Sequence, residues 1–138
     1  MEIQLRDQLT DSWNKYFPGA ELPVVLFYTN DPGDVPYAQK PSGHRCIFAD
    51  IAQVRKGESL AFNQDNIGCG GGQKYAGYRE GQGPDFEFFL SCGIEGKLEG
   101  ERYKKDPETV REMMQGFPEV KAEGKSLIFK RWDKLTED

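Results

Sequence analysis

The sequence predicts an α+β fold in which helices pack on a small mixed sheet, with residues 1–138 forming a single domain. A chain of 138 residues with 37% hydrophobic content can build one modest core, but it is too short for two independent ones. Helical and strand-like segments are mixed along the chain, and no low-complexity tail interrupts them. These observations favour one layered α+β domain.

The first third of the chain predicts a helix, a strand and a long loop. Apolar residues recur at helical spacing over residues 2–16, namely Leu5, Leu9, Trp13 and Tyr16. Residues 23–29, PVVLFYT, are short, branched and aromatic between turn residues, as in a buried strand. The loop over residues 30–45 holds three prolines and two glycines, and a connection of this length is often functional.

The remaining elements follow from apolar spacing and from residues that begin or end helices. A short helix is expected from Cys46 to the capping Gly57, and a strand over residues 59–64. Residues 84–93 have a proline-led helical start and a glycine stop. Asp106 is a typical N-cap for a helix over residues 106–117, and SLIFKRW, residues 126–132, reads as a strand.

Charge and composition narrow the classes of partner. The net charge of −5 and the lack of a basic stripe argue against binding to nucleic acid. The N-terminus lacks the apolar core of a signal peptide, and no apolar run is long enough to cross a membrane. We therefore expect a cytoplasmic protein whose three cysteines, Cys46, Cys69 and Cys92, carry free thiols or act as ligands.

The least ordinary stretch is NIGCGGGQKYAGYREGQG, residues 66–83. Glycines between a strand and a helix let backbone N–H groups approach an anionic ligand or cofactor, which predicts a binding loop at Gly70, Gly71 and Gly72. Three side chains beside the glycines are candidates to reinforce or line this pocket: Lys74, Tyr75 and Tyr78. The stretch matches neither a dinucleotide fingerprint nor a P-loop, and a tight packing turn is the alternative interpretation.

The cysteines suggest a second kind of site. Thiols at helix N-termini are favoured as thiolates, and three of them suit an iron-sulfur cluster or, with His44, a zinc site. The candidate ligands are Cys46, Cys69, Cys92 and His44. Paired C-x2-C spacing is absent, so buried structural cysteines are the alternative. His44 and Cys46 would share one face of an extended segment, which also allows a catalytic pair.

The order of these motifs resembles a known family. PVVLFY, HRCIFADIAQVRKGESLAF and NIGCGGGQKYAGY look like the N-terminal part of the family called domain of unknown function 169, or ArCR. YKKDPETVREMM and IFKRWDKL also stand where that family has a helix and a strand. The resemblance spans nearly the whole chain and implies no established activity.

Three functions follow as expectations. The first is binding of an anionic small molecule or cofactor at the glycine-rich loop, without demonstrated catalysis. The second is a redox role for a metal or iron-sulfur centre held by cysteines. The third is an interaction domain completed by a partner chain, which includes a homodimer.

Overall fold

The computed structural model describes residues 3–43 and 45–136, and their contacts divide the chain into two compact units. The first unit combines Met1–Arg79 with Lys121–Asp138, and the second is Glu80–Val120. The expectation that all 138 residues form one domain stays a prediction. Within the described ranges, no helix is both long enough and apolar enough to pass through a membrane.

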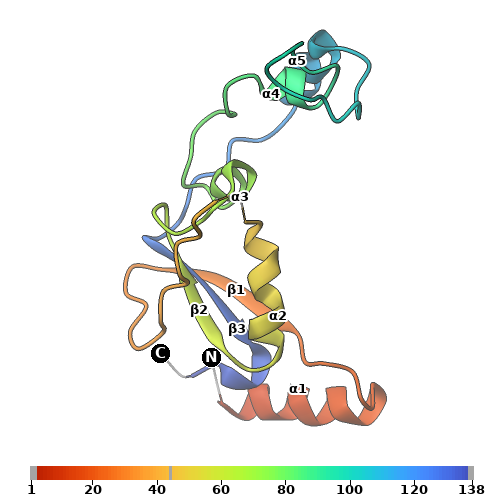
Figure 1. The fold of residues 1–138 in the computed structure, drawn as a ribbon. Coiled ribbons are helices and arrows are strands. Elements are labelled where there is room, and N and C mark those ends of the chain that lie inside the picture. The colour runs from red at the N-terminus through yellow and green to blue at the C-terminus, as the bar shows by residue number, and fades with distance from the viewer. Residues whose placement is uncertain (1–2, 44, 137–138) are drawn as a thin grey trace. The chain divides into compact units, whose positions relative to one another are not determined.

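A three-stranded antiparallel sheet is the centre of the first unit (Figure 1). Its strands are β1 (Val24–Thr29), β2 (Ser59–Phe62) and β3 (Ser126–Arg131), and β3 lies between the other two. Each strand falls within a segment that the sequence predicts as a strand, because branched and aromatic residues there are bounded by turn residues. The sheet and its packed helices confirm the predicted α+β class.

One face of the sheet carries the core of the first unit. The register places Leu60 opposite Phe129 and Phe62 opposite Leu127, so all four side chains point to the same face. The rings of Phe62 and Phe129 lie 4.8 Å apart. The 3-10 turn η1 (Ile47–Asp50) and α2 (Ile51–Arg55) cover this face, and Val54 of α2 is fully buried against it.

The long loop returns along the edge of β2 that β3 does not occupy. The backbone N–H of Ala38 donates to the carbonyl of Ala61 at 2.9 Å, and the N–H of Ala61 donates to Pro36 at the same distance. The Tyr37 hydroxyl hydrogen-bonds to the hydroxyl of Ser126 on β3 at 2.8 Å, on the face opposite the core. This part of the loop is therefore hydrogen-bonded to the outer edge of β2.

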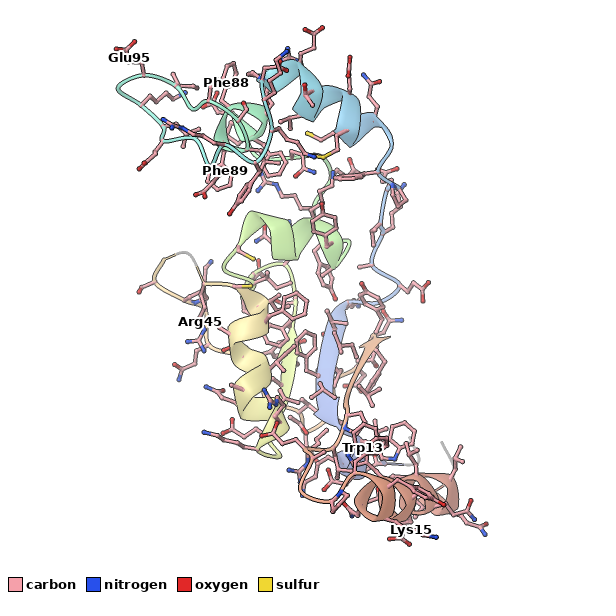
Figure 2. The ribbon with its side chains drawn as sticks, turned by 90° about the vertical axis from the view of Figure 1, so that its right-hand side faces the viewer. Trp13, Lys15, Arg45, Phe88, Phe89 and Glu95 are labelled. Atoms are coloured by element: carbon pink, nitrogen blue, oxygen red, sulfur yellow. The ribbon has the colours of Figure 1, made fainter. Side chains whose placement is uncertain are left out.

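Helix α1 (Ile3–Tyr16) confirms the helix predicted at the N-terminus and contacts η2 (Trp132–Lys134). The indole of Trp132 donates to the carbonyl of Arg6 at 3.0 Å, and the Arg6 guanidinium donates to the carbonyl of Leu135 at 2.9 Å. Trp13 and Lys15 of this helix are labelled in Figure 2. None of the described residues of α1 is fully buried, so it packs on the unit as an added surface element.

The second unit holds α4 (Phe86–Phe89) and α5 (Pro107–Gln115). The carboxylate of Asp106 accepts the Thr109 N–H at 2.8 Å, which confirms the predicted N-cap. This hydrogen bond lowers the pKa of Asp106, because it favours the charged carboxylate. The helix predicted over residues 84–93 is too long: it ends after four residues, and Gly93 with φ of +75° turns the chain away.

Figure 2 shows this second unit with Phe88 and Phe89 on α4 and Glu95 at the tip of the loop that follows. Val110 of α5 is fully buried, and α4 and α5 pack on each other. Gly100 allows the two arms of this loop to approach each other, because a side chain at this position would overlap the backbone N of Gly93. Gly93 and Gly100 thus permit a tight reversal of the chain in this loop.

Candidate functional site

The three consecutive glycines form the first turn of α3 (Gly70–Tyr75), not a loop that precedes a helix. This corrects the prediction from composition, which treated glycine as a loop former. Glycine costs about 1 kcal/mol per residue relative to alanine inside a helix, so α3 does not form by propensity. A cap and tight packing must hold it.

Cys69 supplies that cap. Its backbone is extended, and its sulfur accepts the N–H of Gly72 at 3.1 Å, as the oxygen of a serine or aspartate does at other helix starts. A Cβ atom on Gly72 would lie 2.8 Å from this sulfur and 3.1 Å from Cγ2 of Ile67. Gly72 is therefore a glycine for steric reasons, which supports the packing interpretation at this one position.

The start of η1 and the start of α3 lie beside each other. Cys46 is the N-cap residue of η1, and Cγ2 of the following Ile47 would lie 3.4 Å from a Cβ atom on Gly72. A Cβ atom on Gly68 would overlap Cγ of Pro41 and lie 3.3 Å from the backbone of Arg45. Two places that the sequence singles out, Cys46 and the glycine run, are thus brought together.

The side chain of Arg79, which follows the end of α3, lies next to the first turn of this helix. A Cβ atom on Gly70 would lie 2.9 Å from Nη1 of Arg79, whereas a Cβ atom on Gly71 would meet nothing within 4 Å. Gly70 and Gly71 are both exposed. The guanidinium of Arg79 therefore lies against an exposed stretch of backbone.

The turn at Gly77 brings Arg79 to this position. Gly77 has φ of +72°, and the N–H of Tyr78 donates to the carbonyl of Gln73 at 2.8 Å, which closes the helix as a Schellman motif does. The carbonyl of Gly77 accepts the N–H of Ala122 at 3.1 Å. The chain after α3 is thereby fixed against the segment that leads into β3.

The other three candidates at the predicted pocket have different surroundings. Tyr75 is 58% exposed, and Lys74 is half-buried. Tyr78 packs edge-on against Tyr28 with ring centroids 6.4 Å apart and donates to the carbonyl of Gly124 at 3.2 Å. Burial raises the pKa of Tyr78 to about 12, so its hydroxyl stays protonated. Tyr78 also borders a separate polar hollow with Asn63 and Lys125.

The cysteines divide between the two units. Cys46 is exposed and Cys69 is buried, both in the first unit, whereas Cys92 is exposed in the second. Cys92 contacts the carbonyl of Gly93 at 3.5 Å. Over residues 3–43 and 45–136, no three histidine, cysteine, aspartate or glutamate side chains form a group that could hold a metal ion. His44 lies outside the described residues, so the metal site stays a prediction.

Sequence reasoning missed Arg45 and Arg79 as neighbours of the glycine run. Arg45 stands next to Cys46, just before η1 and α2 (Figure 2), and pairs with Asp50. Arg79 lies within the glycine-rich stretch itself. The local signal for Arg79 was Gly77, because a left-handed turn at the end of a helix reverses the chain direction.

The packing of the glycines leads to opposite expectations for two neighbouring alanine substitutions. Gly71→Ala should stabilise the protein by up to about 1 kcal/mol, because alanine favours the helix and meets open space. Gly72→Ala should destabilise it by about 1–2 kcal/mol, because overpacking against Cys69 and Ile67 outweighs that gain. Urea unfolding of both variants measures the difference, and equal effects would contradict this packing.

Comparison with known proteins places the chain in a family. No curated protein and no solved structure matches it. A family model described as uncharacterised ArCR, domain of unknown function 169, matches residues 20–138, which include every strand and all helices after α1. The chain therefore belongs to the uncharacterised ArCR family, domain of unknown function 169, as its motifs suggested.

Proposed function

We propose that this protein binds an anionic small molecule or cofactor at the segment Gly68–Arg79. The supporting observation is the guanidinium of Arg79, which lies against Gly70 with the open Gly71 beside it. In the described part of the chain, no carboxylate lies within 4 Å of the Arg79 guanidinium. A guanidinium next to exposed backbone N–H groups can donate several hydrogen bonds to one anion.

The electrostatics of this place favour an added negative charge. The N–H groups of Gly72 and Gln73 are used by the sulfur and the carbonyl of Cys69, whereas those of Gly70 and Gly71 have no partner among the described residues. Partly positive N–H groups and a guanidinium repel one another weakly when nothing lies between them. A phosphate or carboxylate between them would accept hydrogen bonds from both.

The neighbouring side chains contribute unequally to this proposal. The charge of Arg45 is largely balanced by Asp50, so Arg45 contributes mainly through its backbone contact with Gly68. Lys74 lies on the same helix and adds a second positive charge to the segment. Reduced thiols at Cys46 and Cys69 fit the cytoplasmic location that we also propose.

The test is a titration of the purified chain with inorganic phosphate and, separately, with acetate, followed by backbone amide NMR. We expect shifts at Gly70, Gly71 and Arg79. Arg79→Gln should weaken the binding of phosphate about tenfold, because it removes a charge-assisted hydrogen bond. Arg55→Gln is the matched control, because Arg55 is an exposed arginine that pairs with Glu21 instead.

Two results would contradict the proposal. Phosphate shifts that avoid residues 68–79 would place the anion elsewhere, and equal affinities for the two arginine variants would remove Arg79 from recognition. Unfolding of Arg79→Gln in urea, compared with that of the unchanged protein, separates lost binding from lost structure.

A second candidate is interaction with a partner chain, including a second copy of this one. It is favoured by β1, which is an edge strand with Leu26 46% exposed and Phe27 36% exposed. Apolar side chains on an open edge are typical of surfaces that pair with another chain. Light scattering measures the mass in solution, and a monomer at every concentration would exclude the homodimer.

A further inference from the structure

The face of the sheet opposite the core is hollowed into a groove of about 840 Å³. This volume lies within the range of small-molecule sites, about 300–1,000 Å³. The groove runs between the loop after β1 and the segment after β3, and it shares no lining residue with Gly68–Arg79. It is therefore a separate hollow of the same unit.

The middle of the groove is apolar. The register places Phe27 of β1 opposite Ile128 of β3, and both side chains line the groove. Val25 lies two residues before Phe27 on the same face, and Trp132 also lines the groove. Ile128 is 1% exposed and Phe27 is 36% exposed, so an apolar ligand body laid here would bury surface mainly on β1.

One end of the groove carries positive charge. Lys130 stands on the central strand, paired on either side with Val25 and Ser59, and lines the groove. Lys134 lines the groove from η2. In residues 3–43 and 45–136, neither ammonium group has a carboxylate within 4 Å.

The acidic residues of the groove do not cancel this charge. Asp31 and Asp34 follow Thr29 at the far end of β1, and a carboxylate oxygen of Asp31 accepts the N–H of Gly33. Thr29 lies four positions after Val25 along the strand, which corresponds to about 13 Å. Glu58 stands next to Ser59, which pairs with Lys130. This end of the groove therefore has two lysines and one carboxylate.

We propose that this groove binds an organic monoanion with an extended apolar body, of the class of medium-chain carboxylates. The carboxylate lies at Lys130, and the chain lies over Val25 and Phe27 toward Thr29. A lysine at one end of an apolar strand face gives such a ligand one ionic contact and one direction. This site is additional to the anion site at Gly68–Arg79.

The experiment titrates the full chain with decanoate below its micellar concentration and follows both backbone amide NMR and tryptophan fluorescence. Shifts are expected at Val25, Phe27, Ile128 and Lys130. Decan-1-ol, which has the same chain without the charge, should bind at least about tenfold more weakly, since the charged contact is lost. The same weakening is expected for decanoate with Lys130→Gln.

Two further variants make the outcome decisive. Lys125→Gln removes the same charge at the start of β3, outside the groove, and should leave the affinity unchanged. Glu58→Gln removes the repelling carboxylate and should tighten binding. The proposal is overturned if millimolar decanoate causes no shifts, if the shifts fall outside the groove, or if decanol binds as tightly. Phosphate binding by Lys130→Gln stays normal in each case, so this failure and that of the Gly68–Arg79 site are distinguishable.

Discussion

Replacing Gly77 with alanine is expected to destabilise the first unit by about 4 kcal/mol. Two costs add at this position. The φ of +72° is unfavourable for any residue with a Cβ atom, and that atom would overlap the backbone of Lys121 and Ala122. Backbone cannot rotate aside as a flexible side chain can, so the turn and the Gly77–Ala122 hydrogen bond are lost together.

Gly19→Ala is the matched control for this prediction. Gly19 has φ of +82°, but a Cβ atom there would meet nothing within 4 Å. Its substitution should therefore cost only the backbone strain, about 1–2 kcal/mol. Urea unfolding of both variants gives the two free energies. If they are equal, the close approach of Lys121 and Ala122 to Gly77 is wrong.

Phe129→Ala should cost about 3–5 kcal/mol, because it removes a buried ring from the centre of the core. Phe129 lies on the central strand, is 1% exposed, and contacts the ring of Phe62. The cavity would lie under η1 and α2, which have few other buried side chains to hold them on the sheet. Thermal unfolding and near-ultraviolet circular dichroism measure the loss of stability and of aromatic packing.

Phe48→Ala tests whether burial, and not ring loss in general, sets that cost. Phe48 belongs to η1 and is 65% exposed. Its replacement should change the free energy of unfolding by no more than about 0.5 kcal/mol. A large effect would show that Phe48 is covered in solution, which would favour the partner-chain candidate.

The sequence predicts best where the signal is local. The strand Val24–Thr29 and the helix Pro107–Gln115 form where expected because spacing, caps and flanking turn residues all lie within a few positions of each element. The prediction that this strand is buried was wrong, because β1 lies at the edge of the sheet and none of its residues is fully buried. The order of the strands depends on contacts between distant segments, and the sequence alone did not give it. The short α4 likewise reflects the tight loop between Gly93 and Gly100, which the helical pattern does not contain.

The candidate site shows the same division. Composition identified the glycine run and Cys46, and the structure places them beside each other. The helical state of Gly70–Tyr75 could not be predicted from propensity, because it depends on a sulfur cap and on the close contacts of Gly72. Arg79 was missed because its position depends on a turn that reverses the chain.

The central position of β3 has a consequence for the rate of folding. Both of its neighbours come much earlier in the sequence, and the nearest pair in the ladder, Phe62 and Leu127, is separated by 65 residues. β1 does not pair with β2, and β2 pairs with β3 only across this long connection, so the described sheet has no short hairpin from which to nucleate. Loops of this length must close before any ladder hydrogen bond forms, which favours slow folding with β1 and β2 exposed as unpaired edges in the meantime.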